Sequence, residues 1–421
     1  MFEKYIIIIL LVFCKNTELF EEYYKEAEEI MSSMTMEQRV SQLIFPRFND
    51  SMKDEDIKTR NPGGFIFFAY DFENKTADEI IKNMNYIQDL SMKTMKLPLG
   101  LGVDEEGGKV CRVSPYQRKE GNFSSPLQIY NESGIKGILK TDQEKRDLLR
   151  KFKLNVNLAP VADFTDDQNA YIYNRTLGRP LSETIDYISK DVQSYVNDNF
   201  TCCTKHFPGY GNNIDTHGDI AIDNRTYESF VDVDFKPFEA GIAQKIPMIL
   251  VAHNIVTCKD DKYPASISKT WHDILRNELK FSGLILTDDL SMEAIKKYSG
   301  ELSPAILAVN AGNDVILTSD FDIHHQAVIE ATENGTISNE TINTACRRVI
   351  AWKLKYLMAQ KEEPSSPVLI IVLSIVGLII IVVVALLLAK FVFCKKKSDS
   401  DEVSGNLIDR ETKDSIPLEN K

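Results

Sequence analysis

The sequence predicts an α/β fold: a (β/α)8 barrel of the TIM type that forms a single domain and is followed by one transmembrane helix. Three observations support this prediction. Short apolar runs that suit buried parallel strands alternate with longer stretches of helical period between about residues 20 and 360. Eight such units over this length fit a closed barrel better than a doubly wound open sheet, which is the alternative. A later apolar run is long enough to span a bilayer.

The eight predicted strands are apolar along most of their length, as expected of strands buried on both faces. They are Val40–Phe48, Gly64–Ala69, Leu97–Asp104, Leu154–Phe164, Thr201–Phe207, Met248–His253, Gly283–Asp288 and Asp314–Thr318. The clearest helical stretches between them are Thr76–Lys93, Ser182–Asp198 and Ser268–Leu279. No linker or change of composition interrupts the pattern before Glu362, so residues 20–360 are expected to form one domain outside the cytoplasm.

Both ends of the chain carry apolar segments. Residues 1–14 contain Lys4 and then an apolar run too short to cross a bilayer, which indicates a signal peptide; a buried N-terminal strand is the alternative. Residues 368–389 carry no charge over twenty-two positions and predict a transmembrane helix. Lysines follow it, so the charged tail, residues 390–421, is expected to be cytoplasmic and disordered. The predicted location is a single-pass type I membrane protein with an extracellular or luminal main domain.

Composition excludes some classes of partner. The net charge of −13 argues against nucleic acid, which requires a basic surface. The chain has no GxxxxGK[ST] phosphate loop, and we expect no cofactor. The cysteines outside the two terminal segments show neither metal-ligand spacing nor a disulfide framework. Nine N-x-[ST] sequons fit a secretory route. They are Asn49, Asn74, Asn122, Asn131, Asn174, Asn199, Asn224, Asn334 and Asn339.

Polar side chains end five of the predicted strands. They are Asp104, Asp163, Lys205 with His206, His253 and Asp288. In a barrel these ends meet on one face, where active sites are built. A single strand-end aspartate is often a helix cap or turn residue, and this interpretation suits Asp289. Five strands that end in this way predict a site.

The loop KHFPGYGNNIDTHGD, which spans Lys205–Asp219, carries further candidates. Asp215 stands two residues before His217, and a carboxylate at this distance can orient an imidazole and raise its basicity. These two residues are therefore a candidate acid–base pair. The competing interpretation is that each is an ordinary solvated loop residue.

Carboxylates together with cationic groups in a secreted barrel fit a sugar substrate. Glycoside cleavage needs a nucleophile below the anomeric carbon and an acid beside the leaving oxygen. No GxSxG nucleophile motif is present. A zinc site made by His206, His217 and His253 is an alternative, but their spacing matches no metal signature.

Five motifs follow one another along the chain. They are GLGVDEEGGKVCRV (Gly100–Val113), LNVNLAPVAD (Leu154–Asp163), TKHFPGYGNNIDTH (Thr204–His217), PASIS (Pro264–Ser268) and LKFSGLILTDDLSMEAI (Leu279–Ile295). In this order they resemble glycoside hydrolase family 3, most closely its single-domain bacterial β-N-acetylglucosaminidases. The resemblance extends from about Glu37 to Asp320 and implies a (β/α)8 barrel that works by a retaining, double-displacement mechanism.

The resemblance also implies a role for individual residues. By the family's [ST]-D-x-x-S pattern, Asp288 would be the nucleophile. The family's D-S-H loop reads D-T-H here, so His217 would be the acid/base and Asp215 would orient it. The contacts to sugar hydroxyls would carry over to Asp104, Arg112, Arg175, Lys205 and His206.

Two positions depart from the family's usual loop. The common KHFPGHG reads KHFPGYG here, so Tyr210 replaces a histidine, and Asn212 stands where an aspartate is usual. Because Tyr210 keeps a hydrogen-bonding group, we expect the loop to be altered in detail rather than lost.

The function that the sequence predicts is a retaining exo-β-N-acetylhexosaminidase. It would release terminal β-linked N-acetylglucosamine from glycans or peptidoglycan fragments through a covalent glycosyl-enzyme, and the membrane would be its other partner. Three alternatives stay open: a phosphorylase or a β-glucosidase of the same family, or a membrane-bound glycan receptor without activity.

Overall fold

The computed structural model describes residues 18–49, 54, 56–213, 221–292, 295 and 297–359. The chain divides into two units, Met1–Gln360 and Lys361–Lys421. The second unit lies wholly outside the described residues, so all of the described elements belong to the first.

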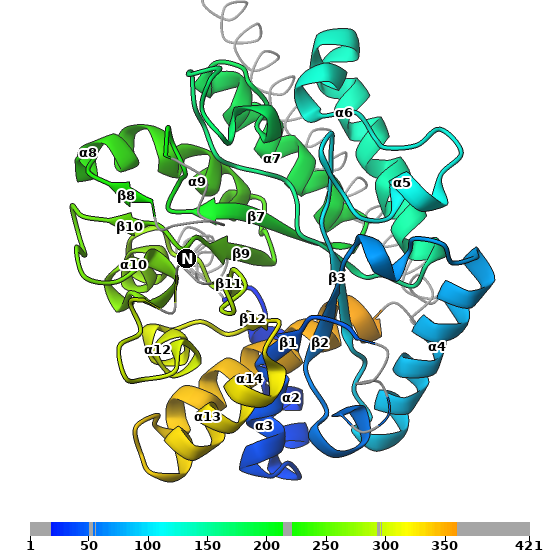
Figure 1. Ribbon diagram of the computed structural model, residues 1–421, viewed down its shortest axis with the longest axis vertical. Coiled ribbons are helices and arrows are strands. Elements are labelled where there is room, and N and C mark those ends of the chain that lie inside the picture. Colours follow the sequence, from blue (N-terminus) through cyan, green and yellow to red (C-terminus); the bar gives the residue numbers. More distant parts are fainter. Residues whose placement is uncertain are drawn as a thin grey trace, which may run out of the picture. The chain divides into compact units, whose positions relative to one another are not determined.

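A curled parallel sheet of six strands forms the centre of this unit (Figure 1). Its strands are β2 (Gly64–Phe67), β3 (Gly100–Val103), β6 (Val156–Asn157), β7 (Thr201–Phe207), β9 (Met248–Val251) and β11 (Leu284–Thr287). They lie side by side in this order, and each neighbouring pair is parallel. The order follows the chain and lacks the reversal of a doubly wound sheet, which excludes that alternative.

Three small strand pairs accompany the sheet. β1 (Ile44–Pro46) and β12 (Ile316–Thr318) form a parallel pair. β4 (Glu105–Gly107) and β5 (Val110–Cys111) form an antiparallel pair directly after β3, and β8 (Ile222–Asp223) pairs with β10 (Ile255–Val256). Each of the eight apolar runs in the sequence contains one strand of the central sheet or of the β1–β12 pair.

The prediction of a closed barrel of eight strands is wrong, because the ladder is not continuous on either side of the β1–β12 pair. A single bridge between Arg47 and Ile66 links this pair to β2. A second single bridge, between Leu286 and Val315, links it to β11. The described sheet is therefore a curled half-barrel with a separate two-stranded pair beside it.

Individual donors explain the two interruptions. On the β2 side, Phe48 donates its N–H to the Ile66 carbonyl, but Pro46, two residues earlier, has no N–H with which to continue the ladder. On the β11 side, the N–H of Leu317 donates to the Thr287 hydroxyl at 3.0 Å instead of to a backbone oxygen. The side chain of Thr287 and the imino acid Pro46 thus interrupt the regular backbone hydrogen bonds of the ladder.

Helices surround the strands (Figure 1). The longer ones are α2 (Tyr24–Ser32), α3 (Met36–Gln42), α4 (Ala77–Thr94), α6 (Pro126–Lys151), α7 (Leu181–Asn197), α9 (Phe235–Ala243), α12 (Pro304–Ala311), α13 (Phe321–Glu333) and α14 (Asn339–Lys353). The short ones are η1 (Glu21–Tyr23), η2 (Asp56–Arg60), η3 (Ala69–Asp71), α5 (Ser114–Gln117), η4 (Tyr173–Arg175), α8 (Tyr227–Ser229), η5 (Phe230–Asp234), η6 (Ala265–Ile267), α10 (Lys269–Asp273), η7 (Ile274–Glu278) and η8 (Leu354–Met358).

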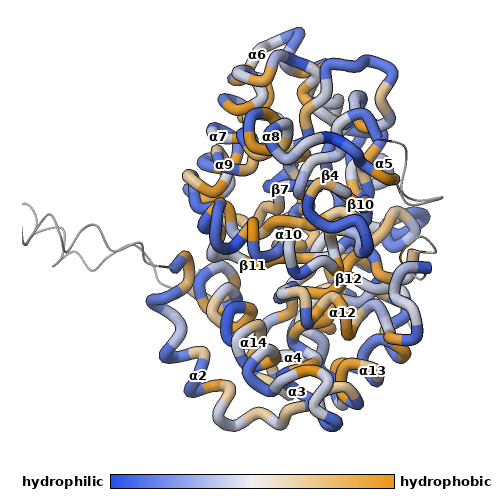
Figure 2. The backbone as a smooth tube through the Cα atoms, turned by 90° about the vertical axis from the view of Figure 1, so that its left-hand side faces the viewer, coloured by the Kyte–Doolittle hydropathy of each residue, from blue (hydrophilic) through white to orange (hydrophobic). Residues whose placement is uncertain are grey.

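Local sequence explains where the helices begin and which of them are buried. Thr76 begins α4 with a capping box, in which its hydroxyl accepts the Glu79 N–H and the Glu79 carboxylate accepts the Thr76 N–H. Figure 2 shows that α12 is apolar along most of its length, and six of its eight residues are buried. A helix that is apolar all round belongs in the interior, and α12 packs against α13 and η6.

The ring of Phe45 holds β1 against the sheet. A Cβ atom at Gly64 would lie 2.8 Å from this ring, and one at Gly100 would lie 2.7 Å from it, so glycine at both positions makes room for it. On its other side Phe45 meets Trp352 of α14, with ring centroids 6.1 Å apart. This apolar contact keeps β1 in place although its ladder to β2 is reduced to one bridge.

The predicted transmembrane helix has no support in the structure. Among the described residues, no helix combines the length and apolar character needed to cross a bilayer. The segment predicted to span, residues 368–389, lies outside the described residues, as do the predicted signal peptide, residues 1–14, and the predicted tail, residues 390–421.

The buried Lys353 allows the cost of a charge in the core to be tested. It is fully buried, and its Nζ donates to Gln42 Oε1 at 2.7 Å. Burial lowers the pKa of Lys353 to about 7, so the charged amine opposes folding below that pH, and this opposition fades as the pH rises toward the ordinary value of 10.5. We expect Lys353→Met to raise the free energy of unfolding by roughly 2–4 kcal/mol at pH 6 and by much less at high pH.

Chemical denaturation at several pH values measures this difference. The matched control is Lys25→Met, which removes a lysine side chain that is 91% exposed and should give no comparable pH-dependent gain. An equal gain in the free energy of unfolding for Lys353→Met at low and high pH would show that burial does not lower the pKa of Lys353.

Candidate active site

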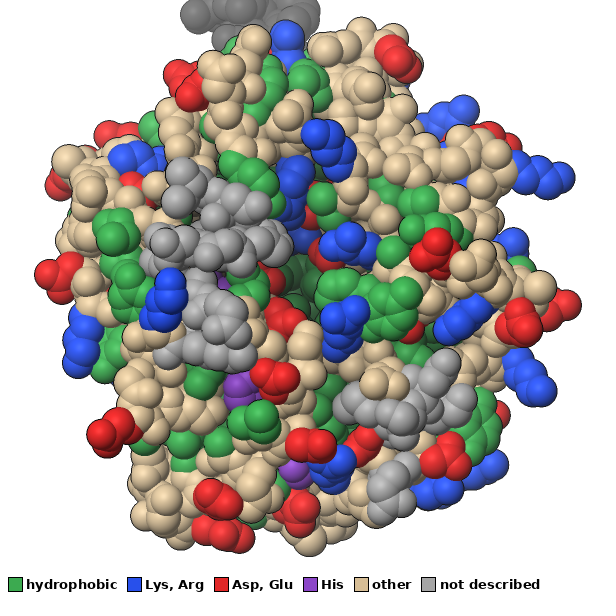
Figure 3. Space-filling view, viewed as in Figure 1, with side chains coloured by type: hydrophobic (Ala, Val, Ile, Leu, Met, Phe, Trp, Pro, Cys, Tyr) green, Lys and Arg blue, Asp and Glu red, His purple; other side chains and the backbone are tan. Residues whose placement is uncertain are grey.

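A cavity of about 340 Å³ opens at the carboxyl end of the central strands. Its lining includes six of the residues predicted for the site: Asp104, Arg112, Arg175, Lys205, His206 and Asp288. They come from segments far apart in the sequence, around β3 to β5, η4, β7 and the end of β11. Figure 3 shows a hollow near the centre of this face, with acidic and basic side chains around it. The fold therefore brings these six residues together.

The other two predicted catalytic residues, Asp215 and His217, lie outside the described residues, which stop at Asn213 and resume at Ala221. The roles of Asp215 and His217 stay predictions.

A buried lysine joins the strands that build the site. Lys205 of β7 is 3% exposed, and its Nζ donates to Asp104 Oδ1 at 2.6 Å and pairs with Glu106 Oε1 at 2.7 Å. Burial alone would lower the pKa of Lys205, but the charges of Asp104 and Glu106 outweigh it and raise the pKa above its ordinary value. Lys205 is therefore a permanent cation that ties β7 to the chain leaving β3.

Glu106 compensates the positive charges of two buried side chains, Arg175 and Lys205. Its carboxylate accepts two hydrogen bonds from the Arg175 guanidinium, at 2.7 and 3.0 Å, in addition to its pairing with Lys205. Burial alone would raise the pKa of Glu106, but the two cations outweigh it and hold the pKa well below its usual range. The side chain of Glu106 is only 2% exposed, whereas that of Asp104 is 16% exposed. Glu106 therefore holds the cations, and Asp104 faces the cavity.

Glu105, the neighbour of both carboxylates, supports the turn that carries Arg112. Its buried carboxylate accepts the backbone N–H groups of Arg112 and Val113, at 3.1 and 2.8 Å, and also bonds Ser114. Arg112 then extends back toward Asp104, with 3.6 Å between their charged atoms. The β4–β5 hairpin is in this way closed by one carboxylate, which places Arg112 at the cavity.

His206 has a defined tautomer. Its Nε2 lies 3.1 Å from Arg175, which can only donate, so Nε2 accepts and Nδ1 carries the proton. The Nδ1–H group donates a hydrogen bond to Asp163 Oδ2 at 2.7 Å. Asp163 also accepts the backbone N–H groups of His206 and Tyr210, at 3.0 and 2.7 Å. Asp163 therefore anchors the loop after β7 and orients His206, and it does not line the cavity.

Asp288 and Asp289 have different tasks at the end of β11. Asp288 lines the cavity, and its Oδ1 accepts the N–H of Asp289 at 2.9 Å. The Asp289 carboxylate accepts the N–H groups of Ser291 and Ser319, at 2.9 and 3.0 Å, which is the turn role expected from sequence. His253 donates from Nε2 to the Asp289 carbonyl at 3.0 Å and so supports this turn from behind.

The structure describes two of the three histidines of the alternative zinc site, His206 and His253. In the part of the chain that the structure describes, no group of three His, Cys, Asp or Glu residues is arranged to hold a metal ion. Both ring nitrogens of His206 and of His253 make hydrogen bonds within the protein. The third member, His217, lies outside the described residues.

Glu106 is the main site residue that the sequence prediction missed. A signal was present, because side chains two residues apart in an extended segment point to the same side, and Glu106 stands two residues after Asp104. Two successive glutamates after a buried strand also need partners. The partners of Glu106, which are Arg175 and Lys205, are distant in sequence, so only the fold identifies them.

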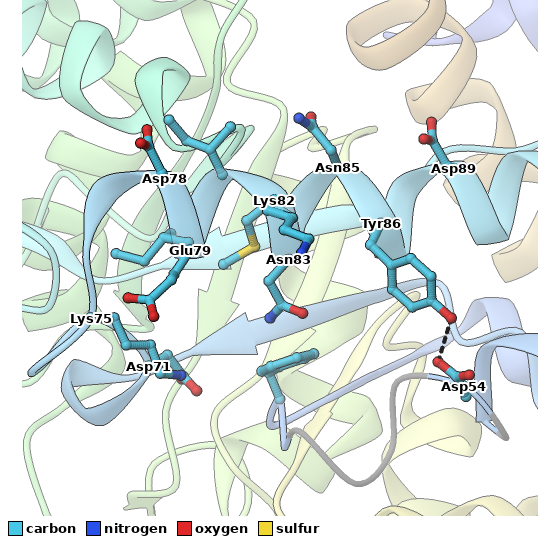
Figure 4. A pocket seen from close by; sticks show the side chains of 14 residues that line it. Asp54, Asp71, Lys75, Asp78, Glu79, Lys82, Asn83, Asn85, Tyr86 and Asp89 are labelled. Carbon is cyan, nitrogen blue, oxygen red and sulfur yellow. Dashed lines mark hydrogen bonds between the residues drawn. The ribbon is translucent and has the colours of Figure 1, made fainter.

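A second, larger groove lies along α4 and is not this site. It has a volume of about 1080 Å³. Figure 4 shows charged and amide side chains of α4 along it, and Tyr86 donates a hydrogen bond to Asp54 at 2.8 Å. None of the residues predicted for catalysis or sugar binding lines it.

Comparison with known proteins gives a consistent result. The family model of the glycosyl hydrolase family 3 N-terminal domain matches residues 35–352. A β-hexosaminidase of Nitrosomonas eutropha is 31% identical over 276 residues, which cover 62% of this chain and 74% of that protein. An uncharacterised secreted glycosyl hydrolase of Arthroderma benhamiae is 26% identical over 310 residues, which cover 69% of this chain and 84% of that protein.

Solved structures show the same fold. A family 3 β-N-acetylglucosaminidase from Paenibacillus superposes with a TM-score of 0.72 at 24% identity, covering 79% of this chain and 65% of that one. The chain thus spans slightly less than two thirds of that relative. A β-N-acetylhexosaminidase from Beutenbergia cavernae superposes with a TM-score of 0.65 at 22% identity, covering 76% of this chain and 99% of that one.

The charge balance around Glu106 gives a direct prediction. Glu106→Gln leaves Arg175 and Lys205 buried with less compensation, so we expect a loss of about 3–5 kcal/mol in the free energy of unfolding at neutral pH. Because the folded-state pKa of Glu106 is depressed, its contribution is present above the unfolded pKa and disappears as the pH falls. The difference between the variant and the parent protein should therefore shrink in acid.

Denaturation curves of both proteins from neutral to acidic pH test this expectation. Glu120→Gln serves as the control, since Glu120 is 68% exposed and pairs only loosely with Arg118 at 3.8 Å. Equal stability losses for the two variants would show that Glu106 does not hold the cations.

Proposed function

The chain belongs to glycosyl hydrolase family 3, and from this premise we propose that it hydrolyses terminal β-linked N-acetylglucosaminides. The names of the β-hexosaminidase relatives support this substrate class, as do the titles of the solved β-N-acetylglucosaminidases. Residues 35–352, which match the family model, contain every residue proposed for the reaction.

One observation carries the proposal: the Asp288 carboxylate lines the same cavity as the polar group around Lys205. The cavity volume of about 340 Å³ lies at the lower end of the range for small-ligand sites. Such a cavity holds one sugar unit with its hydroxyls against fixed charges, and this is what an exo-acting enzyme needs. The hydrogen bond from the Asp289 N–H orients the Asp288 carboxylate.

We assign sugar binding to the polar side chains that line the cavity, which are held in place by buried carboxylates behind them. Asp104 accepts from Lys205 and, unlike Glu106, lines the cavity, so it can accept hydrogen bonds from two neighbouring hydroxyls. Arg175 and His206 are held in place by Glu106 and Asp163 before any substrate arrives. This preorganisation lets the site bind sugar without rearranging its charges.

The reaction proposed is double displacement with retention. Asp288 attacks the anomeric carbon and the glycosidic bond breaks, while His217 gives its proton to the leaving oxygen. Water then attacks the glycosyl-enzyme, His217 takes a proton from it, and Asp288 leaves as carboxylate. Asp215 orients His217 in both steps.

The described ends of the chain on either side of residues 214–220 support this role for His217. Asn213 Nδ2 donates to Asp223 Oδ2 at 2.6 Å, which holds the two ends together. It also donates to the Tyr210 carbonyl at 2.8 Å, and the Tyr210 ring lies 5.6 Å from that of His206 at the cavity. The described residues on the two sides of residues 214–220 are therefore joined to each other, and Tyr210 joins them to His206.

Turnover of a nitrophenyl β-N-acetylglucosaminide by the full chain tests the proposal, with the matching β-glucoside as a comparison. Asp288→Asn is expected to lower kcat by about 10⁴-fold or more, since it removes the nucleophile. His217→Ala is expected to lower it by about 10²–10⁴-fold, the range of general acid–base catalysis. The exposed Asp147→Asn on α6 is the control and should keep full activity.

The stereochemistry of the first product provides a second readout. Proton NMR during the first minutes should show β-N-acetylglucosamine, as retention requires. Formation of the α-anomer, or an Asp288→Asn variant as active as the parent protein, would rule out the mechanism. Turnover of the glucoside alone would correct the substrate class.

A further inference from the structure

A buried polar cluster lies outside the cavity, where α6 packs against β4 and against α7, its neighbour in Figure 1. Its members are Asp142 and Lys145 of α6 and Asp191 of α7, and each is at most 3% exposed. None of the three lines the cavity, and none has a role in the proposed double displacement. We call these three residues the back cluster.

Lys145 connects the back cluster to the site. Its Nζ donates to the backbone carbonyl of Glu106 at 2.7 Å. The next residue, Gly107, has a φ of 102°, which favours glycine, and a Cβ atom added there would lie 3.5 Å from Nζ. Lys145 therefore lies directly against this turn. It holds the backbone of the residue whose side chain holds Lys205 and Arg175.

Lys145 is charged, and its partner is on its own helix. Its Nζ pairs with Asp142 Oδ1 at 2.6 Å, three residues earlier on α6. Burial alone would lower the pKa of Lys145, but the charge of Asp142 outweighs it and raises the pKa above its ordinary value. An ion pair within one helix joins no two parts of the fold. Among the described residues, the hydrogen bond that Lys145 makes beyond α6 is the one to the Glu106 carbonyl.

Asp191 completes the back cluster from α7. Burial raises the pKa of Asp191 well above its ordinary value, and the charge of Asp142 raises it further. A hydrogen bond joins the two carboxyl groups, which requires a proton on one of them. Asp191 therefore carries this proton at neutral pH and donates a hydrogen bond to Asp142. The connections run from Asp191 through Asp142 and Lys145 to the Glu106 carbonyl.

Stability alone does not explain the back cluster. Taking a lysine and a carboxylate out of water often costs more than their attraction returns, and apolar side chains of similar size frequently serve a core equally well or better. The carboxyl group of Asp191 adds further polar atoms to the interior, where they need partners. What the cluster provides, and apolar residues cannot, is a charged donor at a fixed position behind Glu106.

The position of the Glu106 backbone matters to the cavity. Glu106 Oε1 lies 2.7 Å from Lys205 Nζ and 2.7 Å from Arg175 Nη2. Both cations line the cavity, and so does Asp104, two residues before Glu106. A shift of the Glu106 backbone would therefore move three of the groups assigned to sugar binding.

We propose that Lys145, held by Asp142 and Asp191, is a positioning residue for the reaction and sets the position of the sugar-binding groups through the Glu106 backbone. This rests on the proposed hydrolysis, because those groups are defined by their part in that reaction. Lys145 does not line the cavity, so it acts on substrate only through other residues. Its effect should appear in the affinity for the sugar and not in folding.

An apolar back cluster tests the proposal: Asp142→Leu, Lys145→Met and Asp191→Leu together in the full chain. Because no buried charge is left unpaired, we expect this triple variant to resist denaturant as well as the parent protein or better. With the nitrophenyl β-N-acetylglucosaminide we expect KM to rise about 10-fold and kcat to change less than about 3-fold. A purely structural defect would instead reduce the folded fraction, which lowers the apparent kcat and leaves KM unchanged. An unchanged KM in the folded triple variant would overturn the proposal.

A second variant keeps the proposal testable if the triple variant does not fold. Asp142→Asn with Lys145→Gln removes both charges but keeps hydrogen-bonding groups, and the glutamine side chain is one bond shorter than that of lysine. We expect KM to rise by about 3-fold or more, and an unchanged KM again overturns the proposal. The matched control is Lys353→Met, which removes a buried lysine that bonds Gln42 instead and should leave KM as in the parent protein.

Sugar binding separates this proposal from the proposed hydrolysis. Calorimetry measures the Kd of N-acetylglucosamine for Asp288→Asn, with and without the triple change. Turnover by the parent protein with the same KM in the triple variant means that the hydrolysis stands and the positioning role is wrong. Absence of turnover, together with about 10-fold weaker sugar binding after the triple change, means that the hydrolysis is wrong and the positioning role stands. If the parent protein does not turn over the substrate and Asp288→Asn does not bind the sugar, both are wrong.

Discussion

The site depends on a lysine buried between two carboxylates. Lys205 reaches from β7 to Asp104 and Glu106 on the chain leaving β3, so one set of ion pairs both joins distant strands and fixes the charged lining of the cavity. A buried ion is expensive unless it is paired, and Arg175 adds a second cation that Glu106 must also hold. Because Glu106 is withdrawn from the cavity, Asp104 remains available to substrate. Glu106, which holds the buried cations, is thus only two residues away in the sequence from Asp104, which lines the cavity.

The positions of the strands could be predicted from sequence, but the continuity of the sheet could not. Apolar runs separated by helical stretches identify buried parallel strands because burial on both faces leaves no alternation. Whether a ladder continues depends on single donors. The missing N–H of Pro46 is visible in the sequence, but its consequence depends on the register against β2. The capture of the Leu317 N–H by Thr287 depends on a side-chain rotamer. A closed barrel was the wrong expectation for these reasons.

Most of the charged and histidine residues that line the cavity were predicted, but Glu106, which holds two of them, was not. The rule that polar groups gather at strand ends identified Asp104, Lys205, His206 and Asp288, which do line it. The same rule cannot separate a side chain that faces the cavity from one that holds a backbone. Asp163 and His253 also end strands, yet they anchor the loop after β7 and the turn at Asp289. Glu106 was missed because its importance lies in the two cations that it holds, Lys205 and Arg175, and sequence spacing does not identify them.

The central claim is that Asp288 becomes covalently attached to the sugar. A fluorinated N-acetylglucosaminyl fluoride that forms the glycosyl-enzyme faster than water releases it would trap this state. Mass spectrometry of the digested protein should then find one sugar on the peptide that contains Asp288, and fragmentation should place it on that carboxylate rather than on Asp289. Absence of an adduct from protein that turns over substrate, or an adduct on another carboxylate, would contradict the account.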